Sequence, residues 1–154
     1  MALGRRQFSA ALACALPAAW AHAKDTALPV PTSLPQAARR AQAQGQPLVL
    51  LISLPGCVYC ELVRRSYLLP GQRDGSLQAW QLDVSNAATR LIGFDGQPTT
   101  AALQAKAWKA IFTPTVLFLG SQGQELAERL VGIAVPDFYG AYLEQRLAMA
   151  RKAI

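Results

Sequence analysis

Leu54-Pro55-Gly56-Cys57-Val58-Tyr59-Cys60-Glu61 is the stretch of this sequence that decides the fold. A continuous apolar run over residues 47–54 leads into the cysteines and predicts a strand that is buried on both faces. Apolar residues then recur at helical spacing over residues 57–69, and Pro70-Gly71 is expected to end that helix. The two cysteines are therefore expected at a junction between a strand and a helix.

This position gives the first cysteine a distinct chemistry. A thiol in the first turn of a helix faces unpaired backbone N–H groups and the positive end of the helix dipole, and both favour the thiolate over the thiol. We therefore predict that Cys57 is a nucleophile. Because Cys60 follows three residues later on the same side of the helix, it is placed to attack a mixed disulfide formed on Cys57.

The first 23 residues have the features of an export signal and are set aside from the fold prediction. An Arg-Arg pair at residues 5–6 precedes an Ala-rich apolar stretch over 9–20, and Ala-His-Ala at 21–23 is typical of a cleavage site. The segment resembles a bacterial twin-arginine signal, with an ordinary secretion signal as the alternative. We expect cleavage near Ala23 and a periplasmic mature chain.

Cleavage there removes both Cys14 and His22, so the mature chain keeps only Cys57 and Cys60 and has no histidine. A Cys-His hydrolase, a Ser-His-Asp triad and a zinc site built from cysteine and histidine are then all excluded, since each needs histidine or further thiols. We expect no bound metal and no cofactor.

Length and charge limit the remaining classes of function. The chain has 154 residues, 52% of them hydrophobic, which is enough for one domain with one core. Its lysines and arginines are scattered and not interleaved with aromatic residues, so we expect no nucleic-acid binding. No apolar run approaches the roughly 20 residues of a membrane span, so we expect no stable membrane anchor after cleavage. We also expect a monomer.

The rest of the mature chain alternates between helical and strand-like patterns. Thr100 is a predicted helix N-cap, and the core side of that helix is expected to carry Leu103, Ala107 and either Trp108 or Ala110. Pro136 is expected to open the last helix, whose apolar stripe consists of Tyr139, Leu143, Leu147 and Ala150. The expected elements are an extended lead-in over 24–35, a helix over 36–44, strands over 77–84, 115–119 and 125–131, a loop over 85–99, and a helix over 101–110. This order predicts an α/β fold in which the first two strands are parallel and the last two form an antiparallel hairpin.

At this point the chain resembles the thioredoxin family. The resemblance rests on Cys57-Val58-Tyr59-Cys60 after the first strand, on a strand that starts Thr113-Pro114-Thr115 one helix further along, and on the turn at Gly123. It covers nearly all of residues 36–150, within an expected thioredoxin-like domain over 36–154. The fold that it implies is the thioredoxin fold, a central four-stranded mixed sheet flanked by helices.

The resemblance also implies roles for particular residues. The peptide bond before Pro114 is expected to be cis and to face the reactive cysteine, and the Thr113 backbone is expected to bind an extended substrate segment. Tyr59 either shapes this docking surface or packs in the core. Arg64 either stabilises the thiolates or is simply solvated. Leu51 occupies the place where the family usually has a buried aspartate, which leaves open how a proton leaves Cys60.

Together these features predict an exported thiol-disulfide oxidoreductase that reduces disulfides in periplasmic proteins. Its expected partners are disulfide-bearing exported proteins and a membrane electron donor, because exported compartments are oxidising. The alternatives are a disulfide-forming oxidase, a disulfide isomerase, and a non-enzymatic binding protein or chaperone in which Cys57 and Cys60 form a static disulfide.

Overall fold

The structure is a computed structural model that describes residues 27–154. The predicted export signal, its twin-arginine motif and the cleavage site near Ala23 all lie outside the described residues. Within residues 27–154, no helix combines the length and the apolar character needed to cross a membrane.

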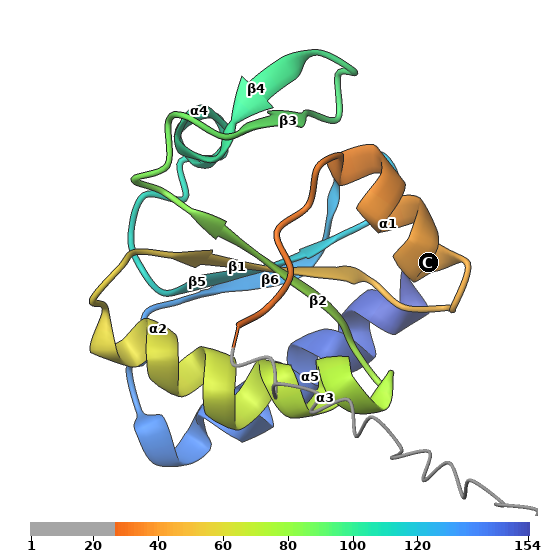
Figure 1. Cartoon of the computed structure of the whole chain (residues 1–154). Helices are drawn as coiled ribbons and strands as arrows, with labels where there is room; N and C mark the ends of the chain where they lie inside the picture. Colours follow the sequence, from red (N-terminus) through yellow and green to blue (C-terminus); the bar gives the residue numbers. More distant parts are fainter. Residues whose placement is uncertain (1–26) are drawn as a thin grey trace, which may run out of the picture.

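A four-stranded mixed sheet forms the centre of the molecule (Figure 1), with the strand order β2-β1-β5-β6. The strand before the cysteines, β1 (Leu48–Ser53), pairs in parallel with β2 (Gln78–Asp83) and antiparallel with β5 (Thr115–Leu119). The last strand, β6 (Glu125–Val131), pairs antiparallel with β5. The predicted mixed sheet is therefore confirmed, including its parallel first pair and antiparallel final hairpin.

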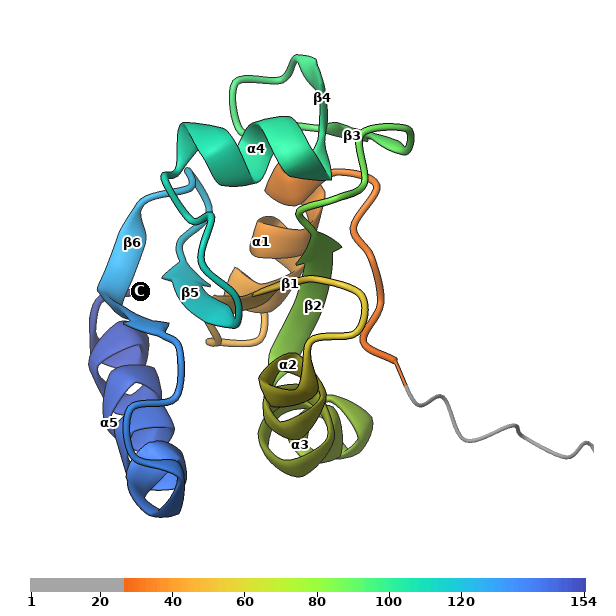
Figure 2. The same cartoon turned by 90° about the vertical axis from the view of Figure 1, so that its left-hand side faces the viewer.

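Helices cover both faces of this sheet, and the alternation of side chains along β1 divides the core between them. Val49 and Leu51 join the cluster beneath the helices after β1 and the C-terminal helix α5 (Tyr139–Lys152). Leu48, Leu50 and Ile52 join the opposite cluster, beneath α1 (Leu34–Gln42) and α4 (Ala101–Ala107). Figure 2 shows these two layers on either side of the sheet. Both faces of β1 are buried, as its continuous apolar run predicts.

The lead-in and α1 differ slightly from the prediction. The helix begins at Leu34, two residues earlier than expected, because the Ser33 side chain caps it and proline occupies its first turn. The preceding residues run along the outer edge of β2, where the Gln81 N–H donates to the Pro29 carbonyl at 2.9 Å. The lead-in thus covers an otherwise open strand edge.

The helix after the cysteines does not end at Pro70-Gly71, so that prediction is wrong. It runs as α2 (Val58–Leu62), a π-helical segment (Val63–Leu68) and α3 (Leu69–Asp74). Proline has no N–H to donate within a helix, and the wider turn accommodates it: the Leu69 N–H donates to the Arg64 carbonyl five residues back. The helix ends at Gly75, whose φ of 82° is readily available only to glycine.

The segment predicted as a loop over 85–99 contains a short hairpin instead, formed by β3 (Arg90–Ile92) and β4 (Pro98–Thr100). Three-residue strands are too short to show a clear alternation, so the sequence did not indicate them. Thr100 caps α4 as predicted, since its hydroxyl accepts from the Leu103 N–H.

The core face predicted for α4 is wrong at Leu103 and Ala107, whereas Ala110, just after the helix, is buried as predicted. Leu103 is 59% exposed and Ala107 is exposed, whereas Ala101 and Ala105 are buried against α1 and the sheet. The helix also ends at Ala107 rather than at residue 110. Small alanines allow α4 to pack against β2, and they give the sequence no strong apolar stripe from which to read the buried face.

Pro136 opens a 3₁₀ turn (Pro136–Phe138) that leads into α5, so the helix proper begins three residues later than predicted. Its buried stripe is the predicted one, consisting of Tyr139, Leu143, Leu147 and Ala150.

Candidate active site

A tight turn at the end of β1 places the first cysteine. The Cys57 N–H donates to the Leu54 carbonyl at 3.2 Å, and Gly56 has a φ of 76°. Proline followed by a residue with positive φ is the pattern of a type II turn, which is why Pro55-Gly56 directs the chain sharply from strand to helix. Cys57 then acts as the N-cap of α2, with its Sγ accepting the Cys60 N–H at 3.2 Å.

Cys57 and Cys60 form a disulfide, with their Cα atoms 5.2 Å apart. The two sulfurs differ in access: Cys57 is partly exposed, whereas Cys60 is only 1% exposed. An incoming reagent therefore meets Cys57 first. The order of nucleophile and resolving cysteine stays a prediction.

Thr113 and Pro114 lie beside this disulfide although they are more than fifty residues away in sequence. The Thr113 hydroxyl is 3.8 Å from the Cys57 Sγ, and the Thr113–Pro114 peptide bond is cis. Pairing of Ile52 with Thr115 brings the start of β5 to the end of β1. The loop is tied to the end of β6, because the Pro114 carbonyl accepts the Gly132 N–H at 2.7 Å.

Exposed apolar side chains lie in both segments that meet at the disulfide. Tyr59 is 57% exposed, so it does not pack in the core, and Val58 beside it is also exposed. Ile111 and Phe112, directly before Thr113, are exposed as well, with Phe112 at 68%. Ile111 and Phe112 were not among the predicted site residues. The available signal was their apolar character just before the Thr113–Pro114 loop.

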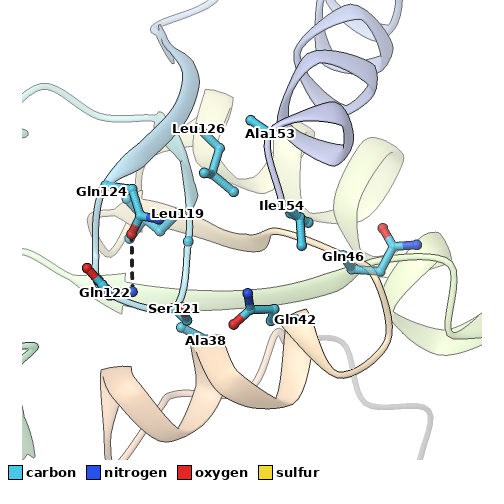
Figure 3. A pocket seen from close by; sticks show the side chains of 11 residues that line it. Ala38, Gln42, Gln46, Leu119, Ser121, Gln122, Gln124, Leu126, Ala153 and Ile154 are labelled. Carbon is cyan, nitrogen blue, oxygen red and sulfur yellow. Dashed lines mark hydrogen bonds between the residues drawn. The ribbon is translucent and has the colours of Figure 1, made fainter.

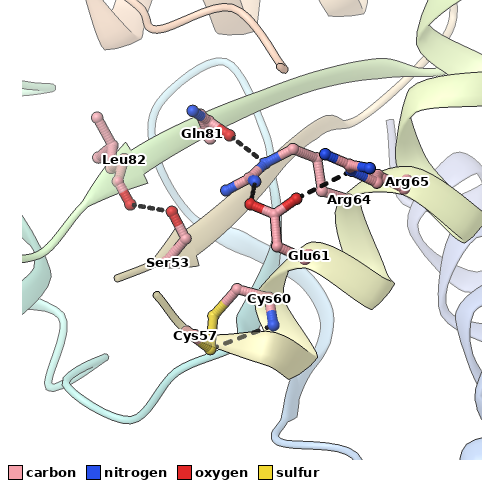
Figure 4. A network of polar contacts seen from close by, with 8 residues as sticks. All are labelled: Ser53, Cys57, Cys60, Glu61, Arg64, Arg65, Gln81 and Leu82. Atoms are coloured by element: carbon pink, nitrogen blue, oxygen red, sulfur yellow. Dashed lines mark hydrogen bonds and ion pairs between the residues drawn. A yellow bond between two sulfur atoms is a disulfide. The ribbon is translucent and has the colours of Figure 1, made fainter. Parts of the chain in front are cut away.

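A polar network lies along the helix that follows the disulfide (Figure 4). Arg64 donates through Nε to the Gln81 side chain on β2 at 2.7 Å, and its guanidinium pairs with Glu61. Arg65 reaches the same carboxylate at 3.1 Å. The hydrogen bond from Arg64 lowers the pKa of Glu61, opposed by partial burial and reinforced by the charges of Arg64 and Arg65. Arg64 is therefore held by the protein and not free in solvent.

The family model described as thioredoxin-like domain matches residues 34–147, which span most of the chain. This chain belongs to the thioredoxin-like domain family. The match includes both cysteines and the Thr113–Pro114 loop. No curated protein sequence matches the chain.

Solved structures of thioredoxins resemble the thioredoxin-like chain in fold. A mutant of a poplar thioredoxin h superposes with a TM-score of 0.55 at 18% identity, covering 84% of this chain and 89% of its own. Thioredoxin O2 from Arabidopsis thaliana gives 0.52 at 14% identity, covering 79% and 96%. A thioredoxin-fold protein from Helicobacter pylori gives 0.50 at 16% identity, covering 86% and 91%. At these identities the likeness concerns the fold.

The family and the Cys57–Cys60 disulfide together support thiol-disulfide oxidoreductase activity for this thioredoxin-like chain. Leu51 is fully buried in the apolar cluster beneath α5, so no carboxylate stands at that position.

Within residues 27–154, no group of three or more potential metal-ligating side chains comes together.

A pocket lies at the far end of the thioredoxin-like domain, where β5 ends (Figure 3). Its volume is about 260 Å³, and it lies between α1, the β5–β6 turn and the C-terminus. Four glutamines dominate its polar lining: Gln42, Gln46, Gln122 and Gln124. None of the residues of the candidate active site lines it, and it plays no part in the disulfide chemistry.

Proposed function

We propose that this protein reduces disulfide bonds in exported polypeptides, with Cys57 as the attacking cysteine and Cys60 as the resolving one. The observation that carries the proposal is the asymmetry of the disulfide. An accessible sulfur caps a helix, its partner is buried at 1% exposure, and the Thr113 hydroxyl lies 3.8 Å from the accessible sulfur. A static disulfide needs none of these features.

The reaction proceeds in two exchange steps. The Cys57 thiolate attacks one sulfur of the substrate disulfide, and the other substrate sulfur leaves as a thiolate and takes up a proton. The Cys60 thiol then loses its proton and attacks the Cys57 sulfur, which releases the second substrate sulfur as a thiol. Two electrons and two protons pass to the substrate, and the Cys57–Cys60 disulfide forms. With Leu51 at the position considered for a buried acid, the Cys60 proton passes to solvent or to the leaving substrate thiolate.

The exposed apolar side chains supply the docking surface in this proposal. Val58 and Tyr59 stand on one side of Cys57, and Ile111 and Phe112 lead into Thr113 on the other. An extended apolar segment of the substrate lies between them, against the Thr113 backbone, with its disulfide over Cys57. Burying exposed apolar area provides the affinity, so we expect weak dependence of substrate binding on salt.

The direction of electron flow and the location complete the proposal. The predicted signal segment supports a periplasmic location. An oxidising compartment would then require a dithiol donor at the membrane to reduce the Cys57–Cys60 disulfide after each cycle.

Insulin reduction tests this activity, with dithiothreitol as the final reductant and aggregation of the freed chains as the readout. Wild-type protein should accelerate aggregation, and Cys57→Ser should leave only the dithiothreitol background. Ser66→Ala, at an exposed position on the same helix, is the matched control and should behave as wild type. Equal rates for wild type and Cys57→Ser would contradict the proposal.

A further inference from the structure

We propose that Arg64, held between Glu61 and Gln81, is a positioning residue that sets the stability of the Cys57 thiolate and with it the reduction potential of the dithiol. The inference rests on the proposed function, because only a cycling dithiol has a potential to adjust. It goes further by assigning this control to a charge outside the cysteine motif.

Arg64 is fixed in place to an unusual degree for a surface helix. Its side chain is only 11% exposed, and it is anchored on two elements, donating through Nε to Gln81 on β2 and through Nη1 to Glu61 on α2. Exposed arginines contribute little, since solvent screens them and their side chains are mobile. A guanidinium that is fixed and largely desolvated exerts a stronger field on its surroundings.

Glu61 carries the negative charge that the Arg64 guanidinium offsets. Its N–H donates to the Cys57 carbonyl at 3.1 Å, so the carboxylate belongs to the first turn beside the dithiol. The hydrogen bond from Arg64 lowers the pKa of Glu61, and the group is therefore ionised at neutral pH. A negative charge here disfavours a thiolate. Figure 4 shows the carboxylate directed toward Arg64 and away from the disulfide. Arg64 both offsets this charge and orients it.

Few other charges compete with this pair. Arg65 also contacts Glu61 but is 65% exposed. Asp83, at the end of β2, accepts from the N–H and hydroxyl of Ser85. The segments beside the disulfide and Pro114, residues 110–117 and 131–136, contain no ionisable side chain. The Glu61–Arg64 pair is therefore the main adjustable charge near Cys57.

Two substitutions should move the dithiol in opposite directions. Arg64→Met keeps most of the side-chain volume but leaves Glu61 with only the exposed Arg65 as a partner, so the ionisation midpoint of Cys57 should rise and the reduction potential should fall. Glu61→Gln leaves Arg64 uncompensated, so the midpoint should fall and the potential should rise. One partly screened charge should change the exchange equilibrium about threefold, or about 15 mV for a two-electron couple.

The experiment measures both quantities in wild type and variants, using thiolate absorbance against pH and equilibration with glutathione buffers. Arg64→Lys retains the charge and should lie closer to wild type than Arg64→Met does. Arg65→Met is the matched control, and its shift should be the smallest because Arg65 is solvent-exposed. A structural role for Arg64 alone would alter stability without shifts of opposite sign.

Shifts of the same sign for Arg64→Met and Glu61→Gln would overturn the inference, as would shifts no larger than that of Arg65→Met. If the wild-type disulfide exchanges with glutathione and reduces insulin while the variants do not differ, only the role of Arg64 is refuted. If the wild-type disulfide does not exchange at all, the proposed function fails and this inference fails with it.

Discussion

Replacing Lys109 with glycine should stabilise the protein, because this lysine has a backbone conformation that suits glycine. Its φ is 56°, and it follows α4 at the position where a Schellman motif places its left-handed residue. The motif is complete: the Ala110 N–H donates to the Ala105 carbonyl at 2.8 Å, and the Lys109 N–H donates to the Lys106 carbonyl at 2.9 Å. The change affects the turn that leads to the Thr113–Pro114 loop.

The expected gain follows from two opposing terms. A left-handed conformation costs a residue with a side chain about 1–2 kcal/mol. Glycine regains that amount but loses about 0.5–1 kcal/mol through the greater freedom of the unfolded chain. The Lys109 side chain is exposed and contributes little packing. Lys109→Gly should therefore raise the free energy of unfolding by about 0.5–1 kcal/mol, or the melting temperature by about 2–4 °C in a domain of this size.

Guanidinium unfolding followed by circular dichroism measures the effect, and insulin reduction should be unchanged. Lys106→Gly is the matched control, because Lys106 is exposed inside α4, where glycine should cost about 1 kcal/mol. The two variants differ by three positions and should change stability in opposite directions. A loss of stability in Lys109→Gly comparable to that in Lys106→Gly would refute the reasoning.

Three further predictions concern the cysteines, the core and pH. Cys60→Ser should accumulate a mixed disulfide with substrate, visible on non-reducing gels, whereas Cys57→Ser should accumulate none; equal trapping by both variants would contradict the assigned order. Phe118→Ala removes a fully buried ring from β5 and should lower the free energy of unfolding by about 3–5 kcal/mol in denaturant melts, and a loss below 1 kcal/mol would show that the ring is not a core contact. The pKa of Glu61 is lowered, chiefly by its hydrogen bond from Arg64. The ionised carboxylate therefore stabilises the fold at pH values above its unfolded pKa, and this contribution is lost as the pH falls through the lowered pKa of the folded state. The stability deficit of Glu61→Gln at pH 7 should accordingly be small, since the carboxylate is half exposed. It should shrink in melts as the pH falls below the ordinary carboxyl value of 4.5 and through the lowered folded value; a deficit that grows with acid would contradict the sign.

The parts of the fold that the sequence predicts well are those specified by local signals. The apolar run before Leu54 identifies β1, and the cysteine spacing and the Thr113-Pro114-Thr115 motif indicate the two segments that meet at the candidate site. These signals are strong because a strand buried on both faces leaves no polar positions. The stripe of α5 is equally clear, since its apolar residues recur at helical spacing.

The parts that the sequence did not predict depend on contacts between distant segments. Pro70 normally ends a helix, but the π-helical turn accommodates it, and packing of Leu68 and Leu69 into the core favours continuing the helix. Arg64 lies four residues after Cys60, but only its contact with Gln81 on β2 distinguishes a held arginine from a solvated one. Such contacts between a helix and a distant strand have no local sequence signature.

The reduction potential of the Cys57–Cys60 pair tests the central claim most directly. The purified protein is equilibrated with glutathione and dithiothreitol buffers of known potential, and the fraction of free thiols is measured by alkylation and mass spectrometry. A protein that reduces exported disulfides should have a value of about −250 mV or lower and should exchange readily. A value near about −120 mV would contradict the proposed direction of electron flow, because such a protein oxidises its partners.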